Sequence, residues 1–371
     1  MALPAWPADL PALVAPPGFG TDALVPEGEV SEYEGGNVRV RRRSLVATMT
    51  LPMRLPPLSR AEFVQFLDFL QRDLNAGVRR FVAPVRLPSG LLGLRICQID
   101  GTVSEADHGP YSIVSFSVRV WGRDAYEPEA VALFARMSSA PSPSRKALIS
   151  ATIARLKYAG LWEKIGLLCV FAAHAPAPAL VNWRRPTLNA ARSGSPLPGF
   201  QVDRGYAGDG VGGFLDHGAG YASIPGVAPD SITDLVWSLT NLANTTAYDA
   251  GTDGASNRQV IMGRVASGLL SVRMASADLI TAPVADSLGL YGATRSGSAV
   301  SLVRNGTVIG TGAATTNSTL QAGNIVSSRA GLNYSPRRLA MRIVGTALTP
   351  ADHAALYAIL RGYMVEIGAV S

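Results

Sequence analysis

A group of polar side chains that could bind a ligand lies between residues 241 and 258. This span carries amide, carboxylate, phenol and guanidinium groups, on Asn244, Tyr248, Asp249, Asp253, Asn257 and Arg258. Amides and carboxylates can make paired hydrogen bonds to sugar hydroxyls, and an aromatic ring can stack on the apolar side of a pyranose. We therefore predict that any ligand binds this segment. The alternative is a solvated connector, because Asn, Asp and Gly are also the common residues of turns.

Catalysis is not favoured by the residues present. Glycoside hydrolysis needs two facing carboxyl groups, and no glutamate occurs between Leu180 and the closing helix. A serine nucleophile needs a histidine base held by an acid, and Asp216 beside His217 is the one suggestive pair. Neighbouring residues on a strand point to opposite faces, so this pair predicts a polar strand end. We expect a protein that is not an enzyme.

A metal site is also not favoured. Oxygen ligands suited to calcium occur on five aspartates, Asp203, Asp209, Asp216, Asp249 and Asp253. Aspartate near glycine is equally typical of tight turns, which we expect here. Cys97 and Cys169 lie far apart among apolar residues, which predicts buried free thiols and neither a disulfide nor a zinc site. We predict no metal and no cofactor.

A stripe of basic side chains lies near the N-terminus. If this segment is a strand, Arg39, Arg41 and Arg43 point to one side of it. We expect the stripe to contact acidic residues in an assembly. The preceding glutamates, of the same or an adjacent subunit, are candidates for this contact. The alternative is that the stripe is a solvated face. Nucleic-acid binding is disfavoured, because residues 1–140 are close to neutral and the basic excess lies after them.

The composition predicts a folded, β-rich chain of two domains. Of its 371 residues 47% are hydrophobic and 16% charged, with 38 glycines and 25 prolines. The N-terminus lacks the features of a signal peptide, and the longest apolar run, Ile165 to Ala173, is too short to span a bilayer. We expect synthesis in a cytoplasm and no membrane insertion.

The predicted first domain covers residues 1–137 and is α+β. It begins with a proline-rich arm, and a helix follows that starts with a capping box, Ser59 with Glu62, and ends at Gly77. Alternating apolar residues predict strands at Leu91 to Ile99 and Ser112 to Val120. A helix from Pro128 to Met137 is predicted to close this domain.

A proline- and serine-rich segment, 138–144, is the predicted linker to a second domain at 145–371. There, a lead-in helix and a buried strand at Ile165 to Phe171 precede many short strands, which favour a sandwich or jelly roll. Asn305-Gly306 predicts a tight hairpin turn, and Thr349 followed by Pro350 predicts the start of a closing helix.

The second domain resembles the concanavalin-like, laminin-G-type jelly rolls found in phage structural proteins. The resemblance rests on Asp203-Arg-Gly-Tyr-Ala-Gly-Asp-Gly210 followed by Phe214-Leu-Asp-His-Gly218, on Ser301-Leu-Val-Arg-Asn-Gly306, and on Leu348-Thr-Pro-Ala-Asp-His-Ala-Ala-Leu-Tyr357. The first domain is similar to minor tail proteins at the tail tip of long-tailed phages, in its proline-rich start, its basic strand, its capped helix and Phe81-Val-Ala-Pro84.

These resemblances imply a structural protein of the virion, located in the phage tail. Its first domain would build a homo-oligomeric ring, six-fold in preference to three-fold, in contact with other tail proteins. Its mainly β second domain would project as an adhesion or decoration module for a host-surface glycan. Two alternatives stay open: a glycan-processing enzyme with the same fold, and a sandwich that contacts only tail proteins.

Overall fold

The computed structural model of the chain describes residues 4–7, 9–14, 29–32, 38–41, 48–86, 92–121, 126–243, 247–252, 257–315 and 319–371. The chain forms two compact units, Met1–Glu127 and Pro128–Ser371. The segment 138–144, predicted as the linker, therefore lies inside the second unit. The physical reason is that the helix before it belongs to that unit: Arg136 donates hydrogen bonds to the carbonyls of Asn182 and Arg185, at 2.9 and 2.7 Å.

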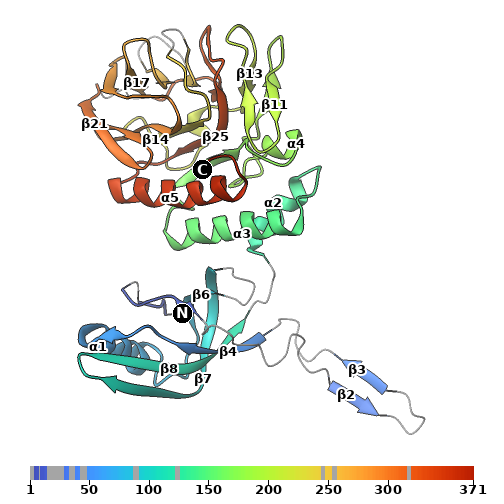
Figure 1. Cartoon of the computed structure of the whole chain (residues 1–371), viewed down its shortest axis with the longest axis vertical. Helices are drawn as coiled ribbons and strands as arrows, with labels where there is room; N and C mark the ends of the chain where they lie inside the picture. The colour runs from blue at the N-terminus through green and yellow to red at the C-terminus, as the bar shows by residue number, and fades with distance from the viewer. Residues whose placement is uncertain are drawn as a thin grey trace. The chain divides into compact units, whose positions relative to one another are not determined.

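The first unit is built on a six-stranded sheet (Figure 1). Its strand order is β1-β6-β7-β8-β4, and β5 also pairs with β8. The strands are β1 (Leu13–Val14), β4 (Thr48–Arg54), β5 (Leu58–Ser59), β6 (Phe81–Arg86), β7 (Leu92–His108) and β8 (Tyr111–Trp121). A separate antiparallel pair is formed by β2 (Glu29–Glu32) and β3 (Val38–Arg41).

One helix covers this sheet and begins as predicted. α1 (Arg60–Asp68) has Ser59 as its N-cap, and both bonds of the capping box with Glu62 are present. The helix continues as a π-helical turn, η1 (Phe69–Asp73). Phe66 and Phe69 are buried with Trp6, whose ring lies 6.1 and 5.5 Å from theirs. The predicted alternation in β8 is also confirmed, since Val114, Phe116, Val118 and Val120 are buried.

The second unit is a β-sandwich, which confirms the mainly β fold class. An eight-stranded sheet has the order β11-β12-β25-β14-β19-β20-β21, with β9 paired to β25. Its strands are β9 (Ile165–Val170), β11 (Gly199–Gln201), β12 (Gly205–Ala207), β14 (Ser231–Ser238), β19 (Gly289–Ser296), β20 (Ala299–Arg304), β21 (Thr307–Ala313) and β25 (Arg338–Gly345).

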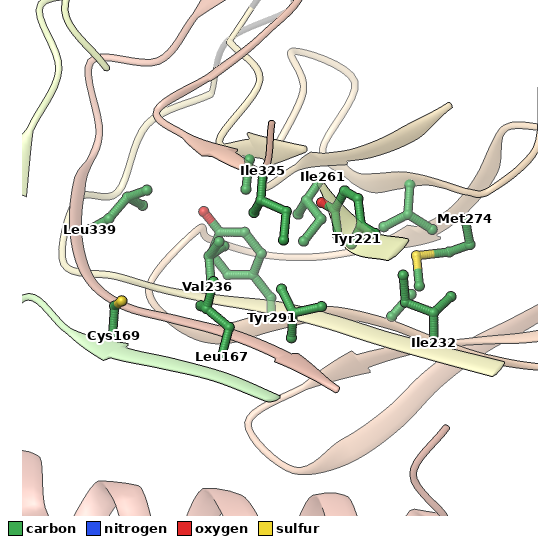
Figure 2. Packing of buried hydrophobic residues seen from close by; sticks show 14 of the residues in the cluster. Leu167, Cys169, Tyr221, Ile232, Val236, Ile261, Met274, Tyr291, Ile325 and Leu339 are labelled. Atoms are coloured by element: carbon green, nitrogen blue, oxygen red, sulfur yellow. The ribbon is translucent and has the colours of Figure 1, made fainter. Parts of the chain in front are cut away.

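A seven-stranded sheet faces it, in the order β10-β13-β22-β15-β16-β17-β18. Its strands are β10 (Ala191–Ser193), β13 (Phe214–Asp216), β15 (Ala250–Thr252), β16 (Gln259–Met262), β17 (Leu269–Met274), β18 (Ile280–Pro283) and β22 (Val326–Ser327). A small hairpin of β23 (Arg329–Ala330) and β24 (Asn333–Tyr334) follows β22. The space between the two sheets is filled by apolar side chains from both, such as Ile232 and Ile261 (Figure 2).

Helices form a third layer on the eight-stranded sheet. α3 (Pro143–Tyr158) and α5 (Pro350–Glu366) lie side by side below β14 and β25 (Figure 1). Trp237 of β14 stacks on Tyr357 of α5, with ring centroids 5.6 Å apart. α5 begins as predicted, with a capping box between Thr349 and Asp352. The unit also contains α2 (Pro128–Arg136), α4 (Pro176–Ala179) and a 3-10 turn, η2 (Tyr221–Ser223).

The predicted hairpin turn at Asn305 and Gly306 is confirmed. Both residues have positive φ, 48° and 80°, and they join β20 to β21. Asn305 Oδ1 accepts a hydrogen bond from the backbone N of Leu290 at 3.0 Å. A side chain at Gly306 would approach Tyr357 Cβ to 2.8 Å. The turn therefore needs glycine for its conformation and also for its contact with α5.

We predict that Gly306→Ala lowers the free energy of unfolding by about 2–4 kcal/mol, the sum of a left-handed backbone and a forced shift of α5. Gly297→Ala is the matched control: Gly297 has φ 63° in the preceding hairpin, and no atom lies within 4 Å of its added Cβ. The control should lose only about 1–2 kcal/mol in urea unfolding. Equal losses in the two variants would show that the contact of Gly306 with α5 does not add to the loss of stability.

Candidate functional site

Asp249, predicted to contact a ligand, is a buried structural residue. Its side chain is fully inaccessible, and its carboxylate accepts four hydrogen bonds. Oδ2 accepts from Tyr291 Oη (2.9 Å) and the backbone N of Gly263 (2.7 Å). Oδ1 accepts from Ser335 Oγ (2.6 Å) and Arg337 Nη1 (2.8 Å). The prediction was wrong for this residue, because a carboxylate in water-free surroundings needs its acceptor positions filled by the protein.

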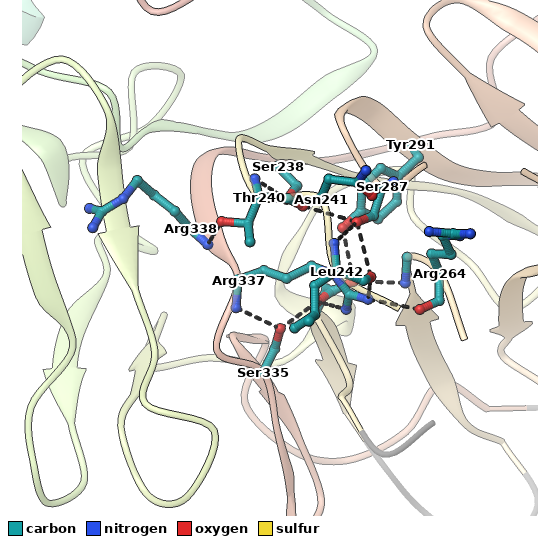
Figure 3. Close-up of polar contacts among 12 residues, drawn as sticks. Ser238, Thr240, Asn241, Leu242, Arg264, Ser287, Tyr291, Ser335, Arg337 and Arg338 are labelled. Carbon is teal, nitrogen blue, oxygen red and sulfur yellow. Dashed lines mark hydrogen bonds and ion pairs between the residues drawn. The ribbon is translucent and has the colours of Figure 1, made fainter. Parts of the chain in front are cut away.

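Arg337 extends this network to the loop after β14 (Figure 3). Its Nη2 donates to the carbonyls of Leu242, at 2.6 Å, and Arg264, at 2.9 Å. Leu242 is held a second time, because its backbone N donates to Ser287 Oγ at 2.9 Å. The start of the predicted ligand loop is thus tied to the interior of the sandwich.

The described residues among the other predicted ligand contacts do not lie in one site. Tyr248 is half-buried against Val260, Met262 and Ala330, so its ring packs on the protein. Asn257 Nδ2 donates to the carbonyl of Thr319 at 3.3 Å. Arg258 is half-buried, and its backbone carbonyl accepts a hydrogen bond from the backbone N of Ser276 at 3.1 Å. Asn244 and Asp253 lie outside the described residues.

The predicted inter-subunit stripe is described only in part. Arg39 and Arg41 lie on β3, and Arg41 is the cross-strand partner of Glu29 on β2. This register places one glutamate of the preceding arm beside the stripe within the same chain. Arg43 lies outside the described residues.

A groove on the outer face of the seven-stranded sheet brings together groups suited to binding. It has a volume of about 280 Å³ and is lined by Phe214, Asp216, Thr252, Asn324, Val326, Arg329 and Gly331; we call it the Asp216 groove. Strand alternation explains its lining. Leu215 on β13 points into the core, so its neighbours Phe214 and Asp216 point outward.

Two acceptor groups line this groove. Asp216 Oδ1 accepts from the backbone N of Gly218 at 2.8 Å and from Asn324 Nδ2 at 2.9 Å. Thr252 Oγ1 donates to the carbonyl of Asn324 at 2.7 Å, which fixes that residue's position. Within the described part of the chain, Asp216 Oδ2 and Asn324 Oδ1 have no hydrogen-bond partner. They are therefore available to accept hydrogen bonds from a ligand.

A guanidinium on aromatic rings also lines the groove. The Arg329 guanidinium carbon lies 4.4 Å from the ring centroid of Phe214 and 5.3 Å from that of Tyr334. Its Nε donates to the carbonyl of Gly331 at 2.6 Å. These contacts orient a planar donor group that is only half-buried.

The hairpin that carries Arg329 is anchored through Asp249. The backbone N of Ser328 donates to the carbonyl of Asp249 at 2.7 Å, and the backbone N of Ser335 donates to that of Ser328 at 2.8 Å. The Ser335 hydroxyl also binds the Asp249 carboxylate. Asp249 therefore holds the base of the hairpin, although it does not line the groove. The sequence offered no signal for this role, since it depends on contacts more than 80 residues apart.

The aspartates weighed for calcium that the structure describes have other partners. Asp203 pairs with Arg145 at 2.8 Å. Asp209 Oδ1 accepts from the backbone N–H groups of Val211, Gly212 and Gly213, and these bonds lower the pKa of its carboxyl to about 2. Among the described residues, no group of three or more His, Cys, Asp and Glu side chains is arranged to hold a metal.

Asp216, the last residue of β13, and the adjacent His217 point in opposite directions, outward and inward, as predicted. His217 is buried between the sheets, with Nε2 3.2 Å from Ser327 Oγ and Nδ1 3.8 Å from Cys169 Sγ. Burial, aided by the charge of Arg342, lowers the pKa of His217 to about 3. Burial also raises the pKa of the Cys169 thiol to about 12, so this Cys–His contact holds no thiolate near neutral pH. Cys97 and Cys169 are both buried and free, as predicted.

Comparison with known proteins finds no matching family model and no matching curated protein. Among solved structures, domain 4 of AbnA, a GH43 extracellular arabinanase from Geobacillus stearothermophilus in complex with arabinotriose, matches at TM-score 0.36 and 14% identity, over 52% of this chain and 98% of that one. A Trypanosoma rangeli sialidase mutant displaying trans-sialidase activity matches at 0.39 and 10%, over 73% and 43%. The binding domain of Paraclostridial Mosquitocidal Protein 1 matches at 0.36 and 11%, over 53% and 52%.

The chain thus spans less than half of that sialidase and about half of that binding domain. These similarities are too distant to carry a ligand or an activity over to this chain. None of the described helices is long and apolar enough to cross a membrane.

The two buried histidines predict a loss of stability in acid. Burial lowers the pKa of His217 to about 3 and that of His353 to about 4. Below the unfolded value of about 6.5 the unfolded chain binds the extra proton, so the free energy of unfolding falls with pH until the folded pKa is reached. His217 alone contributes a slope of about 1.4 kcal/mol per pH unit.

Urea unfolding between pH 7 and pH 4.5 measures this slope. His217→Gln should flatten it by about one proton relative to the parent. His108→Gln, at an exposed residue of the first unit, is the control and should leave it unchanged. A parent slope that survives in His217→Gln would assign the acid sensitivity to other groups.

Proposed function

We propose that the second unit is a carbohydrate-binding β-sandwich and that the Asp216 groove holds the sugar. The observation that carries this proposal is that Asp216 Oδ2, Asn324 Oδ1 and the stacked guanidinium of Arg329 line one groove. Neighbouring hydroxyls of a sugar ring act as donors and acceptors at once. The carboxylate and amide oxygens accept from them, and the Arg329 Nη groups donate to them.

Binding at one such groove is weak. Each contact contributes about 1 kcal/mol net, and the groove of about 280 Å³ offers few contacts. Several copies that face one cell surface increase the total affinity without a deep pocket. A repeated assembly is therefore the setting in which this site is effective.

The proposed setting is a phage tail tip, with the first unit forming a ring and the second unit displayed for adhesion to a host glycan. The sequence resemblance to minor tail proteins and to phage jelly-roll modules supports this setting. The virion is accordingly the proposed location, and other tail proteins are the proposed partners.

The proposed activity is binding without catalysis. Asp216 is the single carboxylate among the described residues that line the groove. Acid–base hydrolysis of a glycosidic bond uses a pair of carboxyl groups. A glycan-processing enzyme is the competing function, and release of reducing ends from bacterial polysaccharide by the purified protein would favour it.

Substitution in the groove tests sugar binding. Asp216→Asn keeps the oxygen that accepts from Gly218 and Asn324, but it removes the negative charge and turns the free oxygen into an amide nitrogen. Arg329→Ala removes the guanidinium donors. We expect each variant to bind surface polysaccharide about tenfold more weakly, the loss of one charge-assisted contact. Asp230→Asn, at an exposed residue next to β14, is the matched control. Unchanged binding in both groove variants would place the site elsewhere.

Oligomer formation tests the proposed setting. The first unit is expected to form a closed ring, six-fold in preference to three-fold, because a ring satisfies the same contact on every subunit. Native mass spectrometry of the full chain and averaged images of intact tails give the copy number. Arg41→Glu should weaken the ring, whereas Arg79→Glu, whose guanidinium binds the carbonyl of Asp73, should not. A monomer at every concentration, together with no ring in the tail, would contradict this setting.

A further inference from the structure

A second groove crosses the end of the eight-stranded sheet. It has a volume of about 720 Å³, and its polar side chains come from Gln201, Arg204, Ser238, Arg338 and Ser371. Leu239 and Leu288 add an apolar wall, and residues 368–371 close one side. We call it the arginine groove. It shares no lining residue with the Asp216 groove, which lies on the other sheet.

The two guanidinium groups of this groove are each held by a backbone carbonyl. Arg338 Nη1 donates to the carbonyl of Gly205 at 3.0 Å, and Gly205 is the chain neighbour of Arg204. Arg204 Nη1 in turn donates to the carbonyl of Ala369. Figure 3 shows Arg338 directed away from the network of Arg337, the adjacent residue. Adjacent residues of the chain thus serve two separate purposes, one inside the sandwich and one at its surface.

No acidic side chain balances these charges. None of the residues that line the groove is Asp or Glu, and in the described part of the chain neither arginine forms a salt bridge. Ser371, which also lines the groove, has its backbone oxygen bound by Arg361 Nη2 at 2.8 Å. The partners of Arg204 and Arg338 are backbone carbonyls, which hold the side chains in place but carry no net charge. Burial lowers the pKa of Arg338, which indicates that its cation is incompletely solvated. Two like charges that line one groove, with no acidic side chain beside them, create a site that an anion stabilises.

We propose that the arginine groove binds an oxyanion, the phosphate or carboxylate group of an acidic ligand. Each planar guanidinium has N–H groups left over from its carbonyl contact, and these match the oxygens of phosphate or carboxylate. Leu239 and Leu288 would contact the apolar part of the molecule that carries the anion. This function is additional to sugar binding in the Asp216 groove and does not depend on it.

Titration of the full chain with inorganic phosphate, at ionic strength held constant with chloride, tests the proposal. Two charge-assisted contacts predict saturable binding with a Kd of about 1 mM. A parallel titration with glucuronate distinguishes a carboxylate ligand from a phosphate ligand, and saturable binding of either anion supports the site. Absence of saturable binding of both would overturn it.

Variants locate the site. Arg338→Gln should weaken binding at least about tenfold, while Arg338→Lys, which keeps the charge without the planar fork, should weaken it less. Arg273→Gln is the matched control: it removes the same charge from β17 of the other sheet, where the guanidinium also donates to a backbone carbonyl. Arg204→Gln provides the same test if thermal unfolding shows that Arg338→Gln is not folded. An equal loss in Arg273→Gln and the groove variants would reveal general charge attraction and refute the proposal.

Discussion

The sandwich depends on two carboxylates that lie out of reach of water. Asp234 and Asp249 are fully buried, and each is paired with a fully buried arginine. An ionised carboxylate in such surroundings is tolerated only where donors surround it, and removal of one partner costs about 3–5 kcal/mol. The positions of the donors around both aspartates are therefore strongly constrained, and the donors come from different parts of the chain.

The Asp234 cluster links the two sheets. Asp234 and Arg342 lie on the neighbouring strands β14 and β25 of the eight-stranded sheet. Gln259 reaches Asp234 Oδ2 at 3.1 Å from β16 of the opposite sheet, and Tyr221 donates to the same oxygen at 2.7 Å. Asp249 directly precedes β15, a central strand of the seven-stranded sheet, and binds Ser335 and Arg337, which follow the β23–β24 hairpin. The alignment of the sheets and the position of the Asp216 groove thus both depend on a buried aspartate that is paired with an arginine.

Local sequence patterns predicted local structure well. The capping boxes at Ser59 and Thr349 and the turn at Asn305 are encoded by a few adjacent residues, and the structure contains all three. The alternation in β8 was sufficient because one face of that strand is apolar. The mainly β class follows from many such short signals.

Features that depend on distant contacts were not predictable in the same way. Arg342 alternates with Met341 and Ile343 along β25, as on a strand with one polar face, but helices cover the outer side of that sheet and the inner side holds Asp234, so both faces are buried. The Asp216 groove unites residues 214–216, 252 and 324–331, which no spacing in the sequence connects. The boundary at Glu127 was displaced from the prolines and serines of 138–144 because α2 packs on the second unit.

The β23–β24 hairpin separates positions that can change from positions that cannot. Its base is fixed by the buried Asp249, whereas Leu332 at its tip is 86% exposed. Substitutions or short insertions at the tip alter the rim of the groove without touching the buried charges. Variation at the rim of the proposed binding groove is therefore largely independent of the folding of the sandwich, because the buried core stays the same.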